Sequence, residues 1–196
     1  MAILVHGFGR NDLGFGNATK NELYAYWKRI VLRSCCKKYK RKYVHYKDTK
    51  IAPEWLTASV FIAWASLQEW EGRQIDKDIL YPDKNIYSPE TCTFVLPATN
   101  NFVLARERGR GDYPLGCCEI KGSDKFQAYC GNPFSKKQEN LGTFKTPQEA
   151  HEAWRKRKHE LAQLVAETEI DPRIIEALKI RYSEVEWYGK YSKILN

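Results

Sequence analysis

Three of the four carboxylates between positions 76 and 90 have a spacing that could hold a divalent cation. Asp76 and Asp78 lie two apart in a segment typical of a short strand, and Glu90 precedes a second such segment. Residues two apart on a strand share a face, so Asp76 and Asp78 are expected to share the ion, with Lys77 opposite unless the strand ends or bulges there. Oxygen ligands suit Mg²⁺ or Mn²⁺, and such a cation stabilises charge developing on a phosphodiester. In the competing interpretation the two aspartates are only caps or ion-pair partners.

A zinc site is not expected. The six cysteines include two adjacent pairs, no Cys-x-x-Cys or His-x-x-x-His spacing occurs, and the four histidines are scattered. Adjacent cysteines are poor material for disulfides, so reduced thiols and a cytoplasmic location are expected.

The composition excludes further classes of protein. Charged residues make up 29% of the 196 residues, and the mean hydropathy is −0.60. No apolar stretch approaches the roughly 20 residues that span a bilayer, so a membrane protein is excluded. The N-terminus has no basic flank and too short an apolar run for a signal peptide. Six Trp, twelve Tyr and eight Phe argue against disorder and predict a packed core.

The positive charge is concentrated between residues 28 and 50. This segment holds ten Lys and Arg residues against one acid, Asp48, whereas the whole chain has a net charge of +8. Tyr39, Tyr43 and Tyr46 are interleaved with the bases. Bases alternating with stacking rings are typical of segments that bind a nucleic-acid backbone, although such a run can also be a solvated helix end. The candidates for backbone contacts are Lys37, Lys38, Lys40, Arg41 and Lys42.

Two amphipathic helices are expected in the first hundred residues. The first runs from residue 20 to about 36, and Asn17 or Thr19 would cap it. The second begins at Pro53 and ends near Trp70. The apolar faces are Leu23, Trp27, Ile30 and Val31 in the first helix, and Leu56, Val60, Trp64 and Leu67 in the second. An aromatic stripe is expected in the core: Trp55, Phe61, Trp64 and Trp70.

A pair of short strands and a linker are expected next. A strand beginning at residue 73, a turn at 81–85 and a second strand at 92–96 precede a short helix from Pro97. Residues 106–112 are rich in Gly and charge, which is typical of a linker.

After the linker, three strands and two helices are expected. The strands cover 115–121, 125–130 and 138–144. Thr146 would cap the next helix in a capping box, with Pro at the first helical position. Asp171 would cap a last helix, which also begins with Pro.

The second of these strands, at 125–130, predicts a sheet with one apolar face and one polar face. Phe126, Ala128 and Cys130 alternate with polar residues and should pack on the helix, whereas the polar set should face outward. Amide and phenol groups can reach base edges, and lysines suit phosphates. A solvated polar face is the alternative. The candidates for DNA contact are Lys121, Lys125, Gln127, Tyr129, Lys136, Lys137, Gln138 and Asn140.

Residues 113–162 resemble the Apetala-type DNA-binding domain of plant ethylene-response factors and phage nucleases. The resemblance implies a three-stranded antiparallel sheet packed on one helix, with the open face of the sheet in the DNA major groove. Cys118 and Ile120 stand where the plant domains use Arg or Trp, so base readout is expected to differ. The matching residues are Gly116, Lys125-Phe126-Gln127-Ala128, Leu141-Gly142-Thr143-Phe144, Thr146-Pro147-Gln148-Glu149-Ala150 and Ala153-Trp154.

Residues 73–101 resemble a diverged HNH (His-Me finger) nuclease motif. Ile75-Asp76-Lys77-Asp78 matches the Asp-His strand, and 88–95 matches the Pro-Glu-Asn-Leu segment. The general-base His of the motif falls on Lys77, and the second metal-ligand position falls on Thr91. A lysine base needs a pKa lowered by desolvation, and His45 is another source of a base. The resemblance implies catalytic roles for Asp76, Lys77, Asp78 and Glu90.

Residues 5–182 as a whole resemble phage-encoded HNH-type proteins that carry an Apetala-type domain. We therefore expect an α+β protein with an HNH-like module at 1–105, a linker at 106–112, a DNA-binding domain at 113–167 and a helical extension at 168–196. The expected function is metal-dependent cleavage of double-stranded DNA, of homing or nicking type. The alternatives are a catalytically inactive DNA-binding or regulatory protein on the same scaffold, and a protein that binds RNA or a host protein through its basic face.

Overall fold

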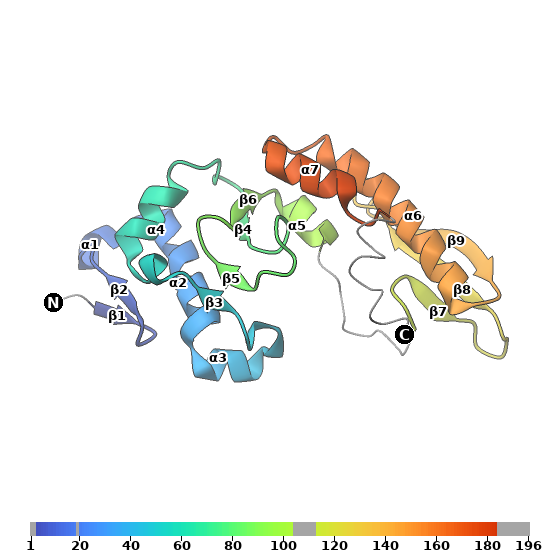
Figure 1. Ribbon diagram of the computed structural model, residues 1–196, viewed down its shortest axis with the longest axis horizontal. Helices are drawn as coiled ribbons and strands as arrows, with labels where there is room; N and C mark the ends of the chain where they lie inside the picture. Colours follow the sequence, from blue (N-terminus) through green and yellow to red (C-terminus); the bar gives the residue numbers. More distant parts are fainter. Residues whose placement is uncertain (1–2, 19, 104–112, 184–196) are drawn as a thin grey trace. The chain divides into compact units, whose positions relative to one another are not determined.

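The computed structural model describes residues 3–18, 20–103 and 113–183 (Figure 1). The fold is α+β, as predicted, and the chain divides into two compact units, Met1–Pro97 and Ala98–Asn196. The predicted linker, 106–112, lies outside the described residues.

Unit 1 contains three small strand pairs and several helices. Strands β1 and β2 pair antiparallel, as do β4 and β6, whereas β3 and β5 pair in parallel. The elements are β1 Ile3–Val5, β2 Gly9–Asn11, α1 Phe15–Ala18, α2 Glu22–Cys35, α3 Lys37–Lys42, the 3₁₀ helix η1 Val44–Tyr46, β3 Lys50–Ile51, the 3₁₀ helix η2 Pro53–Leu56, α4 Ala58–Ala65, β4 Gln74–Asp76, β5 Ile86–Tyr87 and β6 Thr93–Val95.

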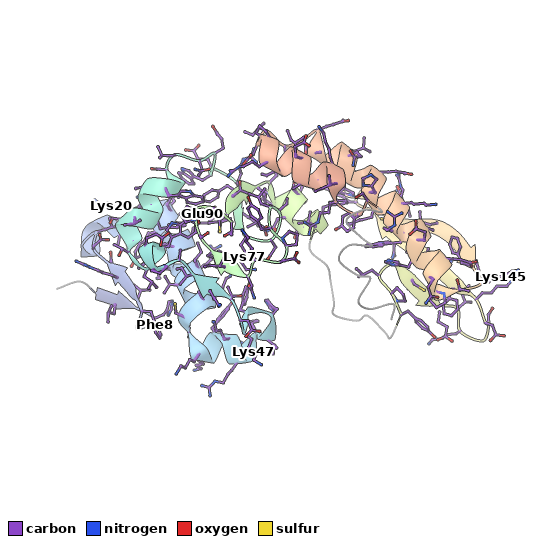
Figure 2. The ribbon with its side chains drawn as sticks, in the orientation of Figure 1. Phe8, Lys20, Lys47, Lys77, Glu90 and Lys145 are labelled. Carbon is purple, nitrogen blue, oxygen red and sulfur yellow. The ribbon has the colours of Figure 1, made fainter. Side chains whose placement is uncertain are left out.

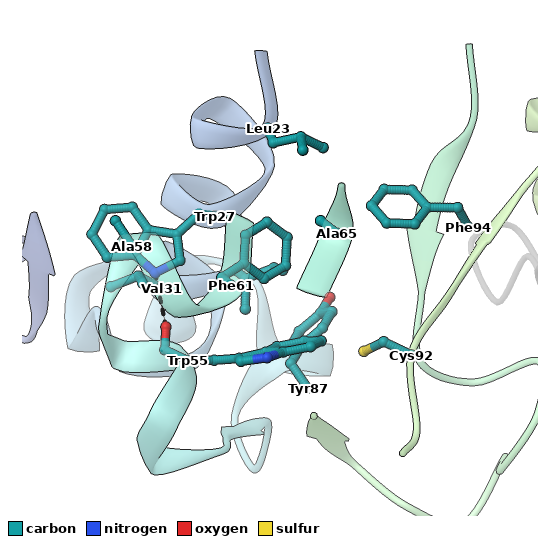
Figure 3. Close-up of a cluster of buried hydrophobic side chains, with 11 residues drawn as sticks. Leu23, Trp27, Val31, Trp55, Ala58, Phe61, Ala65, Tyr87, Cys92 and Phe94 are labelled. Carbon is teal, nitrogen blue, oxygen red and sulfur yellow. Dashed lines mark hydrogen bonds between the residues drawn. The ribbon is translucent and has the colours of Figure 1, made fainter. Parts of the chain in front are cut away.

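Helix α2 provides one side of the core of unit 1. Its predicted apolar face is buried (Figure 3), and Trp27 Nε1 donates a hydrogen bond to the carbonyl oxygen of Trp55 at 2.8 Å. The cap is Asn21 and not Asn17 or Thr19, because the Asn21 side chain accepts a hydrogen bond from the amide of Leu23 at 2.9 Å. The helix therefore begins two residues later than predicted.

The predicted helix from Pro53 to Trp70 was wrong in its length and in its buried face. It is divided into η2 and α4, and ends at Ala65. Thr57 between them is extended, with φ −99° and ψ 125°, which resets the helical phase. Helix α4 consequently buries Ala58, Phe61 and Ala65, whereas Val60 and Leu67 are 43% and 84% exposed.

The aromatic stripe contributes to the core as predicted. Trp55 and Phe61 are fully buried, with ring centroids 5.0 Å apart and an edge-to-face angle of 90°. Trp64 and Trp70 are partly buried against the same cluster, and Trp64 stacks on Phe94 of β6.

Unit 2 is a three-stranded antiparallel sheet with helices. The strand order is β7-β8-β9, and α6 packs on one face of the sheet and against α7. The capping box at Thr146 and the cap at Asp171 are confirmed. The elements are α5 Pro97–Val103, β7 Cys117–Glu119, β8 Phe126–Gly131, β9 Gln138–Phe144, α6 Pro147–Ala166 and α7 Pro172–Ile180.

Helix α5 accounts for a difference in the unit boundary, which the sequence analysis placed at residue 105. The Phe102 ring lies edge-on to Tyr182 at 6.3 Å, and the Phe102 carbonyl oxygen accepts a hydrogen bond from Lys158 Nζ at 2.8 Å. These contacts join α5 to unit 2. Among the helices of residues 3–18, 20–103 and 113–183, none has the length and apolar character needed to cross a membrane.

Candidate nucleic-acid interface

The polar side chains of β8 and β9 gather on the sheet face away from α6. Tyr129 stands directly opposite Asn140, and Gln138 stands opposite Gly131, two residues further along the face of Tyr129. Gln127 stands between Cys118 and Thr143. Ala128 and Cys130 are fully buried on the other face, as predicted. The structure therefore brings the four polar residues predicted on this sheet to one exposed or half-buried surface, which we call the outer sheet face: Gln127, Tyr129, Gln138 and Asn140.

A β-bulge shapes this surface. The register between β8 and β9 shifts between Ala128 and Tyr129, which adds a residue to β9 and increases the local twist. The side-chain oxygen of Asn140 accepts a hydrogen bond from the amide of Gly142 at 3.0 Å. The Asn140 side chain thus offers a ligand its NH₂ donor, which suits the acceptors O6 and N7 of guanine or O4 of thymine.

Exposed lysines lie at both ends of β8. Lys121 is in the turn before β8, Lys125 directly precedes it, and Lys136 and Lys137 are in the turn that follows it. Asn132 holds the second turn, since its side-chain oxygen accepts hydrogen bonds from two amides of the turn. Exposed positive charge therefore flanks the outer sheet face at both ends of β8.

The nearby acids are directed elsewhere or lie in a turn. Glu139 binds Arg157 of α6 in a two-pronged ion pair, with distances of 2.7 and 3.1 Å. Hydrogen bonds from Arg157 and Asn132 lower the pKa of Glu139 to about 2. Glu119 stands opposite Phe126 and so belongs to the α6 side, and Asp124 lies beside Lys125. The outer sheet face consequently keeps its basic margin.

The basic segment in unit 1 runs from the second half of α2 through α3 and η1 to the start of β3. Four of its predicted backbone contacts are exposed: Lys37, Lys38, Arg41 and Lys42. Lys40 differs, because it is half-buried and its Nζ donates to the Thr49 carbonyl oxygen at 2.8 Å. Tyr39 packs on Tyr43 at 4.5 Å and on Tyr46 at 5.8 Å, so these half-buried rings support one another beneath the lysines.

The two short strands predicted around the aspartates, β4 and β6, pair antiparallel, but the expected shared face of the two aspartates was wrong. Strand β4 ends at Asp76, which pairs with Thr93 of β6. Asp76 is buried, and its Oδ1 accepts hydrogen bonds from the amides of Asp78 and Ile79 at 2.7 and 2.6 Å. These bonds close a turn that takes Asp78 off the strand. Burial and the neighbouring Asp78 raise the pKa of Asp76.

Lys77 and Thr91, at the two substituted motif positions, have internal partners. Lys77, labelled in Figure 2, is buried, and its Nζ forms an ion pair with Asp78 Oδ1 at 2.5 Å, so the amine already has a structural partner. The Thr91 hydroxyl donates to the Ile86 carbonyl oxygen at 2.7 Å. Glu90 is exposed, and a hydrogen bond from Ser88 lowers the pKa of Glu90. Within the described ranges, no three His, Cys, Asp or Glu side chains cluster closely enough to hold a metal ion.

The predicted alternative base, His45, is exposed and packs on the Tyr46 ring at 4.2 Å. The predicted backbone contacts did not include Arg33, which also belongs to the basic segment. Its Nη1 donates to the Tyr87 hydroxyl at 3.3 Å, and its Cζ lies 5.2 Å from the centre of the Tyr46 ring. The sequence offered one signal for Arg33: it directly precedes Ser34, which lies on the buried side of α2. All six cysteines are free thiols.

Comparison of the chain with protein-family models, with characterised proteins and with solved structures found no match. The resemblances to the Apetala-type and HNH families stay predictions from the sequence.

Proposed function

We propose that this protein binds double-stranded DNA through the outer sheet face, with α3 of unit 1 contacting the phosphate backbone. The observation that supports this most is the alignment of the polar set in cross-strand register, with Tyr129 opposite Asn140 and the other face covered by α6. A narrow antiparallel ribbon fits the major groove, where amide side chains can distinguish base pairs.

The polar side chains of the sheet and the lysines would make different kinds of contact with DNA. Gln127 and Asn140 would read base edges, and Tyr129 would contact a base or a phosphate. The lysines at the ends of β8 and on α3 would hold the backbone without reading sequence. Such a protein, with six free thiols, fits the cytoplasm.

DNA cleavage is the second candidate function. Asp76, Lys77 and Thr91 all have structural partners, which favours the alternative of a DNA-binding protein on an inactive scaffold. The observation that favours cleavage is the raised pKa of the buried Asp76, since perturbed groups gather at functional sites. Cleavage would need Mg²⁺ or Mn²⁺ to stabilise charge on the phosphodiester, and Asp76, Asp78 and Glu90 do not cluster closely enough in the described structure to hold such an ion together.

Selection from a pool of duplexes with randomised sequence tests DNA binding by the full chain. We expect an enriched sequence, and we expect Gln127→Ala or Asn140→Ala to relax the preference at particular positions, at about 1–3 kcal/mol for each lost base contact. Gln148→Ala, an exposed change on α6, is the matched control. Failure to enrich any sequence, or equal binding of duplex RNA, would contradict the proposal.

Nicking of a supercoiled plasmid that carries the selected site, with Mg²⁺ or Mn²⁺, separates cleavage from binding alone. Asp78→Ala is the informative variant, because Asp78 is half exposed and closes no turn with its side chain. Metal-dependent nicking that this change abolishes would support the enzyme. Binding without nicking in either metal would refute the enzyme and support a catalytically inactive DNA-binding protein.

A further inference from the structure

Arg33 is a half-buried cation whose interactions, within the described residues, are made with tyrosines and not with a carboxylate. Its Nη1 donates to the Tyr87 hydroxyl, and its Cζ lies over Tyr46. Burial alone would lower the pKa of Arg33, but the oxygens of Tyr87, Tyr46 and Tyr39 outweigh this and raise it. The charge is therefore retained in a partly desolvated place, and burying a charge without a counter-ion is costly.

The acids near this position already have partners. Asp78 is ion-paired with Lys77, and Asp76 accepts hydrogen bonds from two amides. Both carboxylates lie close enough to influence the Tyr46 hydroxyl, yet neither forms an ion pair with Arg33 in the part of the chain that the structure describes. Among the residues that the structure describes, the Arg33 guanidinium thus has no carboxylate partner.

Three segments fix the orientation of this guanidinium. Arg33 lies near the end of α2, Tyr46 closes η1, and Tyr87 on β5 is buried and pairs with Ile51 of β3. One face is held by a ring and one edge by a hydroxyl. A guanidinium has five N–H donors, so donors remain for the two-pronged hydrogen bonding that suits a phosphate.

The surroundings add positive charge. Exposed Lys37 begins α3, four residues after Arg33, and exposed Lys47, labelled in Figure 2, comes directly after η1. Lys50, also exposed, begins β3, and its carbonyl oxygen accepts a hydrogen bond from Ser34 beside Arg33. These lysines would attract an anion, but they have no fixed geometry. Arg33 is the cation among them that packing orients.

We propose that Arg33, held by Tyr46 and Tyr87, is an oxyanion-binding residue of unit 1 and that its ligand is a phosphodiester of DNA. The identity of the ligand rests on the proposed function, whereas the anion site itself does not. Lys77 Nζ lies 5.9 Å from the centre of the Tyr87 ring. The bound phosphate would therefore lie at the same end of the β4–β6 pair as Lys77 and Asp78.

Duplex binding by Arg33→Lys provides the first test. Lysine keeps the charge but loses the two-pronged geometry, so the dissociation constant should rise about tenfold. Arg29→Lys is the matched control, because Arg29 is exposed one turn earlier on α2 and also lies over a tyrosine, Tyr26. We expect a change of less than about twofold there. Circular dichroism and the unfolding midpoint check that each variant is folded.

Tyr87→Phe provides a second variant, since it keeps the buried ring and removes the hydroxyl that accepts from Arg33. Because the guanidinium would lose one of its two fixed contacts, we expect about threefold weaker duplex binding. Equal effects of Arg33→Lys and Arg29→Lys, with Tyr87→Phe unchanged, would overturn the inference and leave DNA binding through the outer sheet face intact.

A measurement without DNA separates the two proposals. The full chain, labelled with ¹⁵N, is titrated with dimethyl phosphate while the arginine Nε–Hε resonances are followed. We expect the Arg33 resonance to shift and saturate, and the Arg29 resonance to stay. This result in a protein that binds no duplex would support the anion site and refute the proposed function. Arg33 shifting no more than Arg29 would overturn the anion site.

Discussion

Gly116 lies directly against the indole of Trp154, at the contact between the start of β7 and α6. A Cβ on Gly116 would come within 2.0 Å of Trp154 Cγ, and the backbone of Gly116 has a φ of +78°. Trp154 is itself buried, and its ring stacks on His151. The close approach of strand and helix, and with it the support of the outer sheet face, therefore requires glycine at position 116 for two separate reasons.

Gly116→Ala is expected to destabilise unit 2 by about 3 kcal/mol or more, because the helix must move away and the backbone is strained. Gly122→Ala is the matched control, with a φ of +76° and open space around the added methyl group. It should cost only about 1 kcal/mol. Urea unfolding followed by circular dichroism measures both. Equal losses would show that the contact with Trp154 is unimportant.

Much of unit 2 could be predicted because its signals are local. The capping box at Thr146 defines the start of α6, and the alternation in β8 assigns each side chain to a face of the sheet. Helix α2 was predictable for the same reason, since its apolar spacing is regular. The extended residue Thr57 has no such signal, and so the phase of α4 was missed.

The candidate sites were harder to predict because they depend on contacts distant in sequence or on where a strand ends. The turn that Asp76 closes decides that Asp78 leaves the strand, and an alternating pattern does not indicate this. Lys40 looks like Lys38 and Lys42 in the sequence, yet only its Nζ reaches Thr49 in the described structure. The environment of Arg33 depends on Tyr87, 54 residues away.

Substitutions at Asp76 should separate its role as an acceptor from its charge. Asp76→Ala leaves the amides of Asp78 and Ile79 without their acceptor and should cost about 1–3 kcal/mol. Asp76→Asn keeps an oxygen at that place and removes a carboxylate whose ionisation burial disfavours. We expect this variant to be at least as stable as the wild type at pH 7, measured by urea unfolding.

The pH dependence provides a further check on Asp76. Its pKa is raised from 3.8, so between that value and the raised one the folded protein binds more protons than the unfolded chain. The contribution of Asp76 to stability is therefore lost as the pH rises through this window. The wild type should therefore lose stability relative to Asp76→Asn as the pH rises through this window. A difference in stability that stays constant with pH would refute the raised pKa of Asp76.

Lys40 and Lys38 should behave differently although they are neighbours on α3. Lys40→Met removes the bond to the Thr49 carbonyl oxygen and should destabilise unit 1 by about 1 kcal/mol. Lys38→Met should leave stability unchanged and lower the slope of log affinity against log salt by about one, since Lys38 is exposed. Thermal unfolding and duplex titrations at several salt concentrations test this pair, and identical behaviour of the two variants would contradict it.

Lys158 should make the stability of unit 2 increase with pH above about 8. Its Nζ donates to the Phe102 carbonyl oxygen and lies 3.6 Å from the centre of the Phe102 ring. Burial lowers the pKa of Lys158 from 10.5 to about 8, with Cys130 opposing the shift and Arg181 adding to it. The folded state therefore binds fewer protons than the unfolded chain between these values.

Because the cost of burying the charged amine disappears as the proton is lost, the folded state gains stability through this window, at most about 1.4 kcal/mol per pH unit. Lys158→Met also loses the bond to Phe102, and any change in that bond when the amine loses its proton is already included in the pKa of Lys158. The difference between wild type and Lys158→Met, from urea unfolding at pH 7, 8, 9 and 10, cancels the titration of tyrosines and thiols elsewhere. The free energy of unfolding of the wild type should rise relative to that of Lys158→Met as the pH rises. If the two proteins instead show the same pH dependence, Lys158 is charged and solvated in the folded protein.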